Sequence, residues 1–170
     1  CTMQKTRKEE RWLKIAVIDD MEQEIRNVKS HLARVGEEDD VFGFSSVAEY
    51  EAFVEKNRTA FDVLFLDIML REQNGIEIGE QLVNRNNGML LVFISADPSF
   101  FRDVYKVRHT YFLTKPIDSY YFDDCMRRIR AQLSSRKLIL DTGGEKQVVE
   151  LYNVLYIESQ LRKTIFHFHN

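Results

Sequence analysis

Polar side chains able to bind a metal ion or a phosphoryl group stand where apolar runs of the sequence end. Asp67 closes one such run, Asp19 and Asp20 follow a second, and Ser95 and Lys115 follow two others. Crowded carboxylates repel one another and favour a hard divalent cation, and Mg²⁺ suits a site with few protein ligands and room for water. With a lysine and a hydroxyl beside it, such a site suits phosphoryl transfer, with Asp67 as the nucleophile.

The elements that must bring these residues together alternate in type along the chain. Apolar runs of strand length predict strands at 13–18, 41–44, 63–67, 89–94 and 111–113. Helical spacing predicts helices at 21–35, after Ser46, at 76–83, from Pro98 and at 120–133. Because no tight hairpin joins these strands, crossovers build a parallel sheet covered on both faces, and the carboxyl ends of its strands share one edge.

Two of the helices carry start signals of their own. Ser46, with Glu49 three residues later, has the pattern of a capping box. The helix that opens at Pro98 is expected to carry three apolar residues on one side: Phe101, Val104 and Tyr105.

Each candidate site residue also has a simpler interpretation. Asp20 could cap the helix at 21–35, with Gln23 at the capping-box position. Ser95 could be a loop hydroxyl, and Lys115, which precedes Pro116, could be a solvated lysine ahead of a turn. These interpretations do not explain why all of them occur together at the ends of different strands of one sheet.

Composition indicates a soluble globular protein of one ordinary domain plus a fragment. The chain has 170 residues, 44% hydrophobic and 30% charged, and a formal net charge of −3, which is not that of a chain dominated by nucleic-acid binding. No apolar run approaches the roughly 20 residues needed to cross a bilayer, and no signal-peptide core is visible. Cys1 and Cys125 offer neither metal-ligand spacing nor a disulfide framework, so we expect a cytoplasmic protein without a membrane partner.

The pattern changes after residue 135. Strand-like runs at 138–140, 147–151, 155–157 and 164–168 leave no room for crossover helices and predict antiparallel β structure. About 34 residues cannot normally bury an independent core. The expected organisation is a disordered extension at 1–11, a domain at 12–135 and an incomplete, mostly-β segment at 136–170.

Four stretches of the first domain resemble the receiver domains of two-component response regulators, and together they are highly specific. They are residues 17–20, 64–68 with Asn74-Gly75 downstream, 93–96 and 112–117. The resemblance spans about residues 13–133 and implies a flavodoxin-like receiver fold, with a five-stranded doubly wound parallel sheet. It also implies that a sensor histidine kinase passes a phosphoryl group to Asp67.

The resemblance assigns a metal role to four residues. Asp20, Asp67 and the backbone carbonyl of Met69 would bind Mg²⁺, with Asp19 supporting them. The protein would then be a phosphoacceptor with at most self-catalysed phosphotransfer and dephosphorylation, not an enzyme with a separate substrate.

The same resemblance implies a switch. Ser95 and Lys115 would contact the phosphoryl group, and Ser95 and Phe112 would reposition after phosphorylation. A change on the face made by the fourth helix, the fifth strand and the fifth helix would then favour a homodimer, because local charge biases a two-state element.

The tail resembles the opening strands of a LytTR-type DNA-binding domain. The matching residues are 154–159, followed by 162–165, and they cover about a third of such a domain. The implied function is transcription control through DNA binding by the complete C-terminal domain, of which this chain holds a truncated part.

Two other functions remain open at this stage. One is an interaction module of the same fold that works without phosphorylation, since fold does not determine function. The other is a phosphatase of the haloacid-dehalogenase kind, which also uses a strand-end aspartate and Mg²⁺. That chemistry needs a second aspartate as general acid two residues after the nucleophile, where this chain has Met69.

Overall fold

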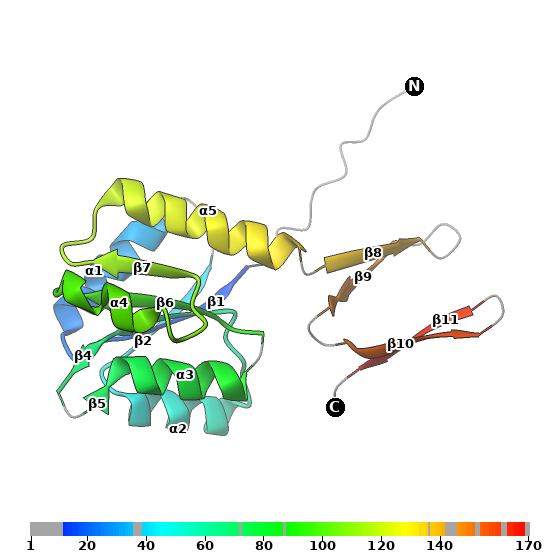
Figure 1. Ribbon diagram of the computed structural model, residues 1–170, viewed down its shortest axis with the longest axis horizontal. Coiled ribbons are helices and arrows are strands. Elements are labelled where there is room, and N and C mark those ends of the chain that lie inside the picture. Colours follow the sequence, from blue (N-terminus) through cyan, green and yellow to red (C-terminus); the bar gives the residue numbers. More distant parts are fainter. Residues whose placement is uncertain are drawn as a thin grey trace.

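The structure, a computed structural model, describes most of the chain (Figure 1). The described residues are 12–35, 39–71, 73–86, 88–135, 137–141, 146–151, 154–160 and 163–168. The extension predicted at 1–11 lies outside them. No helix in these ranges is both long enough and apolar enough to span a bilayer.

Helices and strands alternate as predicted up to residue 135. The strands there are β1 (Lys14–Ile18), β2 (Asp40–Phe44), β3 (Val63–Asp67), β4 (Met69–Leu70), β5 (Gln73–Asn74), β6 (Leu90–Ser95) and β7 (Tyr111–Thr114). The helices are α1 (Glu22–Arg34), α2 (Val47–Asn57), α3 (Gly75–Arg85), the 3-10 helix η1 (Pro98–Phe100), α4 (Phe101–Val104) and α5 (Ser119–Ser135). The tail adds β8 (Lys137–Asp141), β9 (Lys146–Glu150), β10 (Val154–Gln160) and β11 (Lys163–Phe168).

Five strands form one parallel sheet in the order β2-β1-β3-β6-β7. This confirms the predicted five-stranded doubly wound sheet. From β1 the chain goes outward to β2 on one side and then continues through β3, β6 and β7 on the other, so the strand order reverses between β1 and β3. Ligands of open parallel sheets bind at the carboxyl ends of the strands where the order reverses. Asp67 ends β3, and Asp19 and Asp20 follow β1.

Helices cover both faces of this sheet (Figure 1). On one face α1 and α5 pack against the strands, with Val28 and Phe122 in the core. On the other face α2, α3 and α4 contribute Tyr50, Leu82 and Val104. β3 and β6 are buried along their whole length because a central parallel strand faces helices on both sides. The sheet edge that carries the polar residues is therefore held by a rigid, two-sided core.

The predicted cap of α2 is present, but its second hydrogen bond differs. The Ser46 hydroxyl accepts a hydrogen bond from the backbone amide of Glu49 at 3.2 Å, as expected for an N-cap. The Glu49 carboxylate accepts hydrogen bonds from the amide and hydroxyl of Ser45, at 2.7 and 2.9 Å. In the predicted capping box this carboxylate would have bonded Ser46 instead.

The helix expected from Pro98 was only partly right. It is a 3-10 turn followed by four residues of α-helix, and Asp97 caps it by accepting a hydrogen bond from the amide of Ser99 at 2.8 Å. Val104 is buried, whereas Phe101 and Tyr105 are exposed. The prediction that Phe101, Val104 and Tyr105 share one apolar side is therefore wrong, because only Val104 of the three is buried in the core.

A two-stranded hairpin of β4 and β5 was not predicted. Met69 pairs with Asn74 and Leu70 pairs with Gln73, directly after the strand that ends at Asp67. The α3 helix starts in the next residue, Gly75, whose amide donates a hydrogen bond to the Ile68 carbonyl at 3.0 Å. Two-residue strands have too little apolar pattern to be seen in a sequence.

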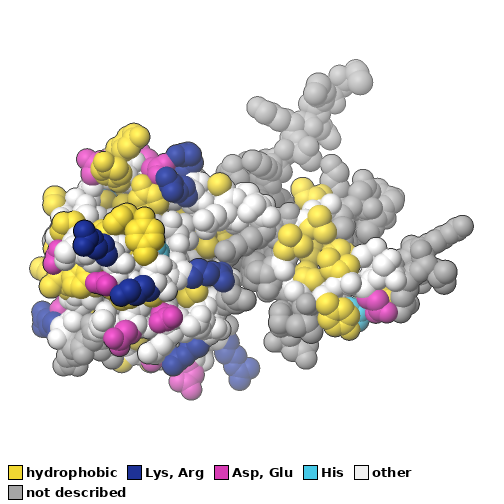
Figure 2. Space-filling view, viewed as in Figure 1, with side chains coloured by type: hydrophobic (Ala, Val, Ile, Leu, Met, Phe, Trp, Pro, Cys, Tyr) yellow, Lys and Arg dark blue, Asp and Glu magenta, His cyan; other side chains and the backbone are white. Residues whose placement is uncertain are grey.

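The antiparallel structure predicted for the tail is confirmed. β8 pairs with β9, and β10 pairs with β11, each as an antiparallel hairpin. Apolar side chains are exposed on both hairpins (Figure 2). They include Ile139, Val148, Tyr156 and Ile157.

Candidate functional site

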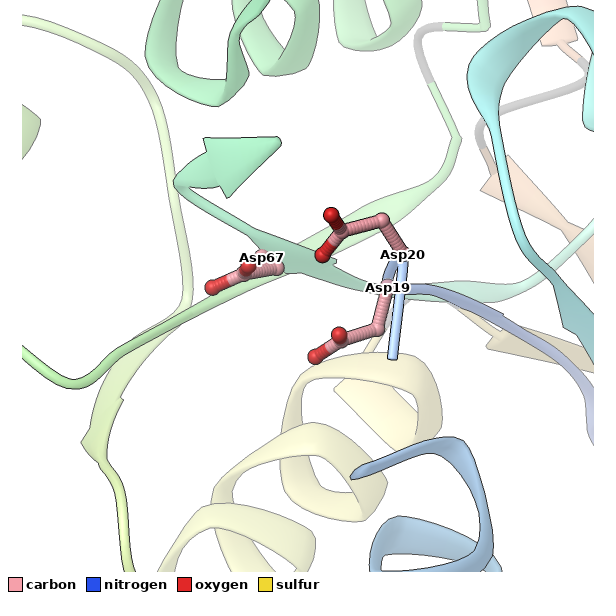
Figure 3. Close-up of side chains that lie close together, drawn as sticks. All are labelled: Asp19, Asp20 and Asp67. Atoms are coloured by element: carbon pink, nitrogen blue, oxygen red, sulfur yellow. The ribbon is translucent and has the colours of Figure 1, made fainter. Parts of the chain in front are cut away.

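Three carboxylates gather at the carboxyl edge of the sheet, as Figure 3 shows. Asp19 and Asp20 come from the end of β1 and Asp67 from the end of β3. One oxygen of each lies within 4.8 Å of an oxygen of the others, and this is a spacing that can hold a metal ion. Asp19 and Asp67 are buried and Asp20 is half-buried, so the cluster opens to solvent on the side of Asp20.

The turn between β1 and α1 places the first two carboxylates. One oxygen of Asp19 accepts a hydrogen bond from the backbone amide of Met21 at 2.9 Å. Met21 is the N-cap residue of α1, and no side chain caps that helix. The simpler interpretation of Asp20 as a helix cap is therefore wrong, and its carboxylate is available to the cluster.

Lys115 is the cation of the cluster. It follows β7, and its backbone amide donates a hydrogen bond to the Ser95 carbonyl at 2.8 Å, which holds the chain at the sheet edge. Its ammonium lies 2.7 Å from Asp19 Oδ2 and 3.3 Å from Asp67 Oδ1. Burial lowers the pKa of this lysine, but its hydrogen bond to Asp19 and the charges of both aspartates outweigh burial, and the net pKa is raised. Lys115 is therefore a permanent positive charge.

Asp67 has the most unusual environment of the three acids. Its side chain is 5% exposed, and its Oδ1 accepts no hydrogen bond from the described residues, because the Lys115 contact is an ion pair without hydrogen-bond geometry. Burial raises the pKa of Asp67, and the nearby Asp19 charge adds to this. The Lys115 charge and a backbone hydrogen bond from Met69 lower the pKa without cancelling the rise. A buried carboxylate oxygen that accepts no hydrogen bond is costly, so this atom can accept a new bond or ligand.

Ser95 ends β6, and Phe112 lies within the neighbouring strand β7. Ser95 is fully buried, and its hydroxyl accepts a hydrogen bond from the Asp97 amide at 3.1 Å. The sheet register sets Asp67 opposite Ile94, one residue before Ser95. Phe112 is partly buried against the core and meets Phe101 edge-on, with ring centroids 5.8 Å apart. The fold thus brings Ser95 to the same edge as Asp67, and it places Phe112 next to the exposed end of α4.

Two neighbours of the acids were not predicted to contribute to the site. Arg71 follows β4, and its Nε lies 2.8 Å from Asp20 Oδ2. Gly75 packs so closely behind Asp67 that an added Cβ would lie 2.3 Å from the Asp67 carbonyl oxygen. The position of Arg71, four residues after the central aspartate, was the only sequence signal for it. Gly75 belonged to one of the stretches that resemble receiver domains, but the reason for a glycine there, its close contact with the backbone of Asp67 and Ile68, came from the structure.

The donor set suits a hard divalent cation. It consists of three carboxylates, and one of their oxygens, Asp67 Oδ1, is buried and accepts no hydrogen bond from any described residue. Mg²⁺ in proteins is bound by a few carboxylate oxygens and keeps several water molecules, so it needs a site with one side open to solvent. The cluster can therefore hold a metal ion at the end of the strand that carries Asp67.

Comparison with known proteins agrees with this geometry. A family model described as the response regulator receiver domain matches residues 15–133. The sensory transduction protein LytT of Bacillus cereus is 27% identical over 124 residues, which cover 73% of this chain and 50% of the relative. The transcriptional regulatory protein LytR of Staphylococcus aureus is 24% identical over 123 residues, or 70% of this chain and 48% of the relative. The chain spans about half the length of the curated relatives it matches.

Solved structures share the fold. The BeF3-activated DrrB receiver domain superposes with a TM-score of 0.59 at 22% identity, covering 71% of this chain and 99% of that domain. A CheY-like response regulator receiver domain protein of Methanospirillum hungatei gives a TM-score of 0.60 at 20% identity, covering 74% of this chain and 96% of its own. At these identities the likeness establishes the fold alone.

Proposed function

Because the chain belongs to the response regulator receiver domain family, we propose that a sensor histidine kinase passes a phosphoryl group to Asp67. One observation carries the proposal. Oδ1 of Asp67 is buried and accepts no hydrogen bond within the part of the chain that the structure describes, yet it lies 3.3 Å from the Lys115 ammonium. A nucleophile needs a free oxygen, and the charge that develops on the phosphoryl group needs a cation close by.

The transfer uses the side chains in distinct roles. An oxygen of Asp67 forms a bond to phosphorus while the bond from phosphorus to the kinase's imidazole nitrogen breaks, and that nitrogen keeps the electron pair. Lys115 neutralises phosphoryl oxygens from its position beside Asp67. The raised pKa of Lys115 keeps it charged throughout.

Asp20, Asp67 and the Met69 carbonyl are the proposed ligands of Mg²⁺, with Asp19 supporting them. Mg²⁺ held by these groups would supply positive charge to neutralise the phosphoryl oxygens. Asp19 has a second task here, because its carboxylate accepts hydrogen bonds from Lys115 and from the Met21 amide. We therefore assign Asp19 chiefly to holding the lysine in place.

The proposed output begins at Ser95 and Phe112. The Ser95 hydroxyl accepts a hydrogen bond from Asp97 and would turn to donate to the phosphoryl group. Phe112, packed between the core and Phe101, would then shift and change the surface of α4, β7 and α5. Such coupling needs only local charge acting on an element with two arrangements.

The second part of the proposal is transcription control. We assign residues 12–135 to the receiver domain and 136–170 to the start of a LytTR-type DNA-binding domain. The support is the pair of antiparallel hairpins and their exposed apolar side chains, which a complete domain would bury. The similarity to proteins named for transcriptional regulation and sensory transduction points the same way.

The test of phosphorylation uses the chain with Mg²⁺ and a small phosphodonor such as acetyl phosphate. Intact mass spectrometry should show one added phosphoryl group on the wild type and none on Asp67→Asn. Asp103→Asn is the matched control, because it removes an exposed acid on α4 that pairs with Lys106. This control should be phosphorylated like the wild type.

An unmodified wild type would contradict the proposal and favour the interaction module that works without phosphorylation. Release of phosphate in many turnovers without a stable adduct would favour a phosphatase instead.

A further inference from the structure

The three carboxylates of the site are not equally free to bind a cation. The Lys115 ammonium contacts Asp19 and Asp67, whereas Arg71 contacts Asp20 through its Nε at 2.8 Å. The Arg71 side chain is 79% exposed, and that of Asp20 is 19% exposed. The most accessible acid of the cluster is thus already paired with a cation of the chain itself.

The two cations of the chain differ in how easily they can leave. Lys115 is 14% exposed, and its backbone is tied to Ser95 at the end of the sheet. Arg71 reaches Asp20 from the end of the short β4 strand and is otherwise surrounded by solvent. An exposed ion pair contributes little stability, so an incoming ion can replace Arg71 far more easily than Lys115.

A divalent cation and the Arg71 guanidinium would bind the same carboxylate, that of Asp20. Both are attracted by the Asp20 carboxylate, and each repels the other when both stand next to it. Asp20 offers two oxygens, one of which faces Arg71. A metal ion bound by Asp20 and Asp67 would therefore lie close to a second positive charge, in addition to Lys115, unless Arg71 withdrew.

We propose that Arg71 competes with the metal ion for Asp20 and so sets how much divalent cation the site needs. The inference rests on the proposed function only in that it takes the acid cluster to bind Mg²⁺. In the metal-free chain Arg71 neutralises part of the crowded negative charge. When the metal ion binds, the Arg71 side chain leaves Asp20 and moves into solvent.

The test is a titration of the unphosphorylated chain with MgCl₂, followed by NMR of its backbone amides. Arg71→Ala should bind Mg²⁺ about two- to fivefold more tightly than the wild type, which matches the strength of an exposed ion pair. Arg85→Ala is the matched control, since it removes an equally positive, exposed arginine that pairs with Glu51. Thermal unfolding of each variant checks that the fold is kept.

A second measurement follows Arg71 itself. In the wild type the resonance of its Nε–H should move as Mg²⁺ is added, with the same midpoint as the amides of the site. In 1 M KCl the gain of Arg71→Ala over the wild type should shrink, because salt screens an exposed pair.

Each outcome decides the matter. Tighter binding by Arg71→Ala but not by Arg85→Ala supports competition. Equal affinity of Arg71→Ala and the wild type, or weaker binding by Arg71→Ala, overturns it while leaving the metal site intact. If neither the wild type nor Arg71→Ala responds to Mg²⁺, the metal site of the proposed function fails, and the competition fails with it.

Discussion

The chemistry of this protein depends on the surroundings of single carboxylate oxygens. Asp67 and Asp19 are both buried at the same edge, but they are satisfied differently. Asp19 accepts hydrogen bonds from Lys115 and the Met21 amide, whereas Oδ1 of Asp67 accepts none from the described residues. A residue that keeps an unsatisfied buried oxygen lowers the stability of the metal-free fold, and such a cost is common at functional sites.

The raised pKa of Asp67 leads to a prediction about stability and pH. The folded chain holds the Asp67 proton to a higher pH than the unfolded chain does, so stability falls as pH rises from the ordinary aspartate pKa through the raised one. Asp67→Asn carries no such charge. In EDTA this variant should therefore melt at a higher temperature than the wild type at pH 7, with a difference that shrinks as pH is lowered toward 4.

The measurement is thermal unfolding by circular dichroism across that pH range. Asp103→Asn, which removes an exposed charge, should have the same melting temperature as the wild type at every pH. A lower melting temperature for Asp67→Asn than for the wild type at pH 7 would contradict the prediction. It would mean that attraction to Lys115 outweighs burial, so that the pKa of Asp67 is lowered on folding.

At the scale of elements, the join from β3 to α3 positions the central aspartate. The chain leaves β3 at Asp67, forms the β4–β5 hairpin and returns to start α3 at Gly75. Asn74 caps α3 by accepting a hydrogen bond from the Ile76 amide at 3.0 Å. The start of the helix lies against the backbone of Asp67 and Ile68, so the helix and Asp67 are held together.

This close approach predicts that Gly75→Ala is strongly destabilising. The new methyl group would lie 2.3 Å from the Asp67 carbonyl oxygen and 2.7 Å from Ile68 Cα, and backbone atoms cannot move aside as side chains do. The free energy of unfolding, measured in urea, should fall by about 2 kcal/mol or more.

Gly43→Ala on β2 is the comparison for this substitution. There the methyl group would meet side-chain atoms of Ile25 and Lys29, which can rotate, so the loss should be smaller. An equal or larger loss for Gly43→Ala would show that the backbone contact at Gly75 is not what matters.

At the scale of the whole molecule, exposed aromatic side chains lie at and just after α4, next to Phe112. They belong to the surface of α4, β7 and α5 that the proposed switch would alter. Phe101 and Tyr105 are exposed and meet edge-on, with ring centroids 5.0 Å apart. Phe112, which is partly buried against the core, contacts Phe101 edge-on. We propose this surface as the place where a phosphorylated chain meets a second copy, because aromatic residues are enriched among the residues that dominate binding.

The prediction concerns assembly in the presence of beryllofluoride and Mg²⁺, which mimic the phosphorylated state. Sedimentation should show a dimer for the wild type and a monomer without beryllofluoride. Tyr105→Ser should weaken the dimer roughly tenfold, since truncating such an anchor costs more than 1 kcal/mol. Tyr156→Ser, which changes another exposed tyrosine, on β10, should dimerise like the wild type. Dimerisation that is unaffected by Tyr105→Ser would place the contact elsewhere.

Most of the fold could be predicted from the sequence alone. Unbroken apolar runs such as 63–66 are typical of strands buried on both faces, and helical spacing between them leaves a parallel sheet as the consistent arrangement. The same logic placed Asp19, Asp20, Asp67, Ser95 and Lys115 at one edge, because the ends of parallel strands must share it. The antiparallel tail also followed from its pattern of short runs and turns.

Only the tertiary structure decided how the charges at that edge are paired. Which side chains pair depends on small differences in distance between segments far apart in the chain. A pattern of residue types does not contain these distances. For that reason Lys115 could be placed at the site but not assigned chiefly to Asp19, and Arg71 could not be paired with Asp20. The short α4, the β4–β5 hairpin and the contact behind Gly75 likewise depend on packing rather than on periodicity.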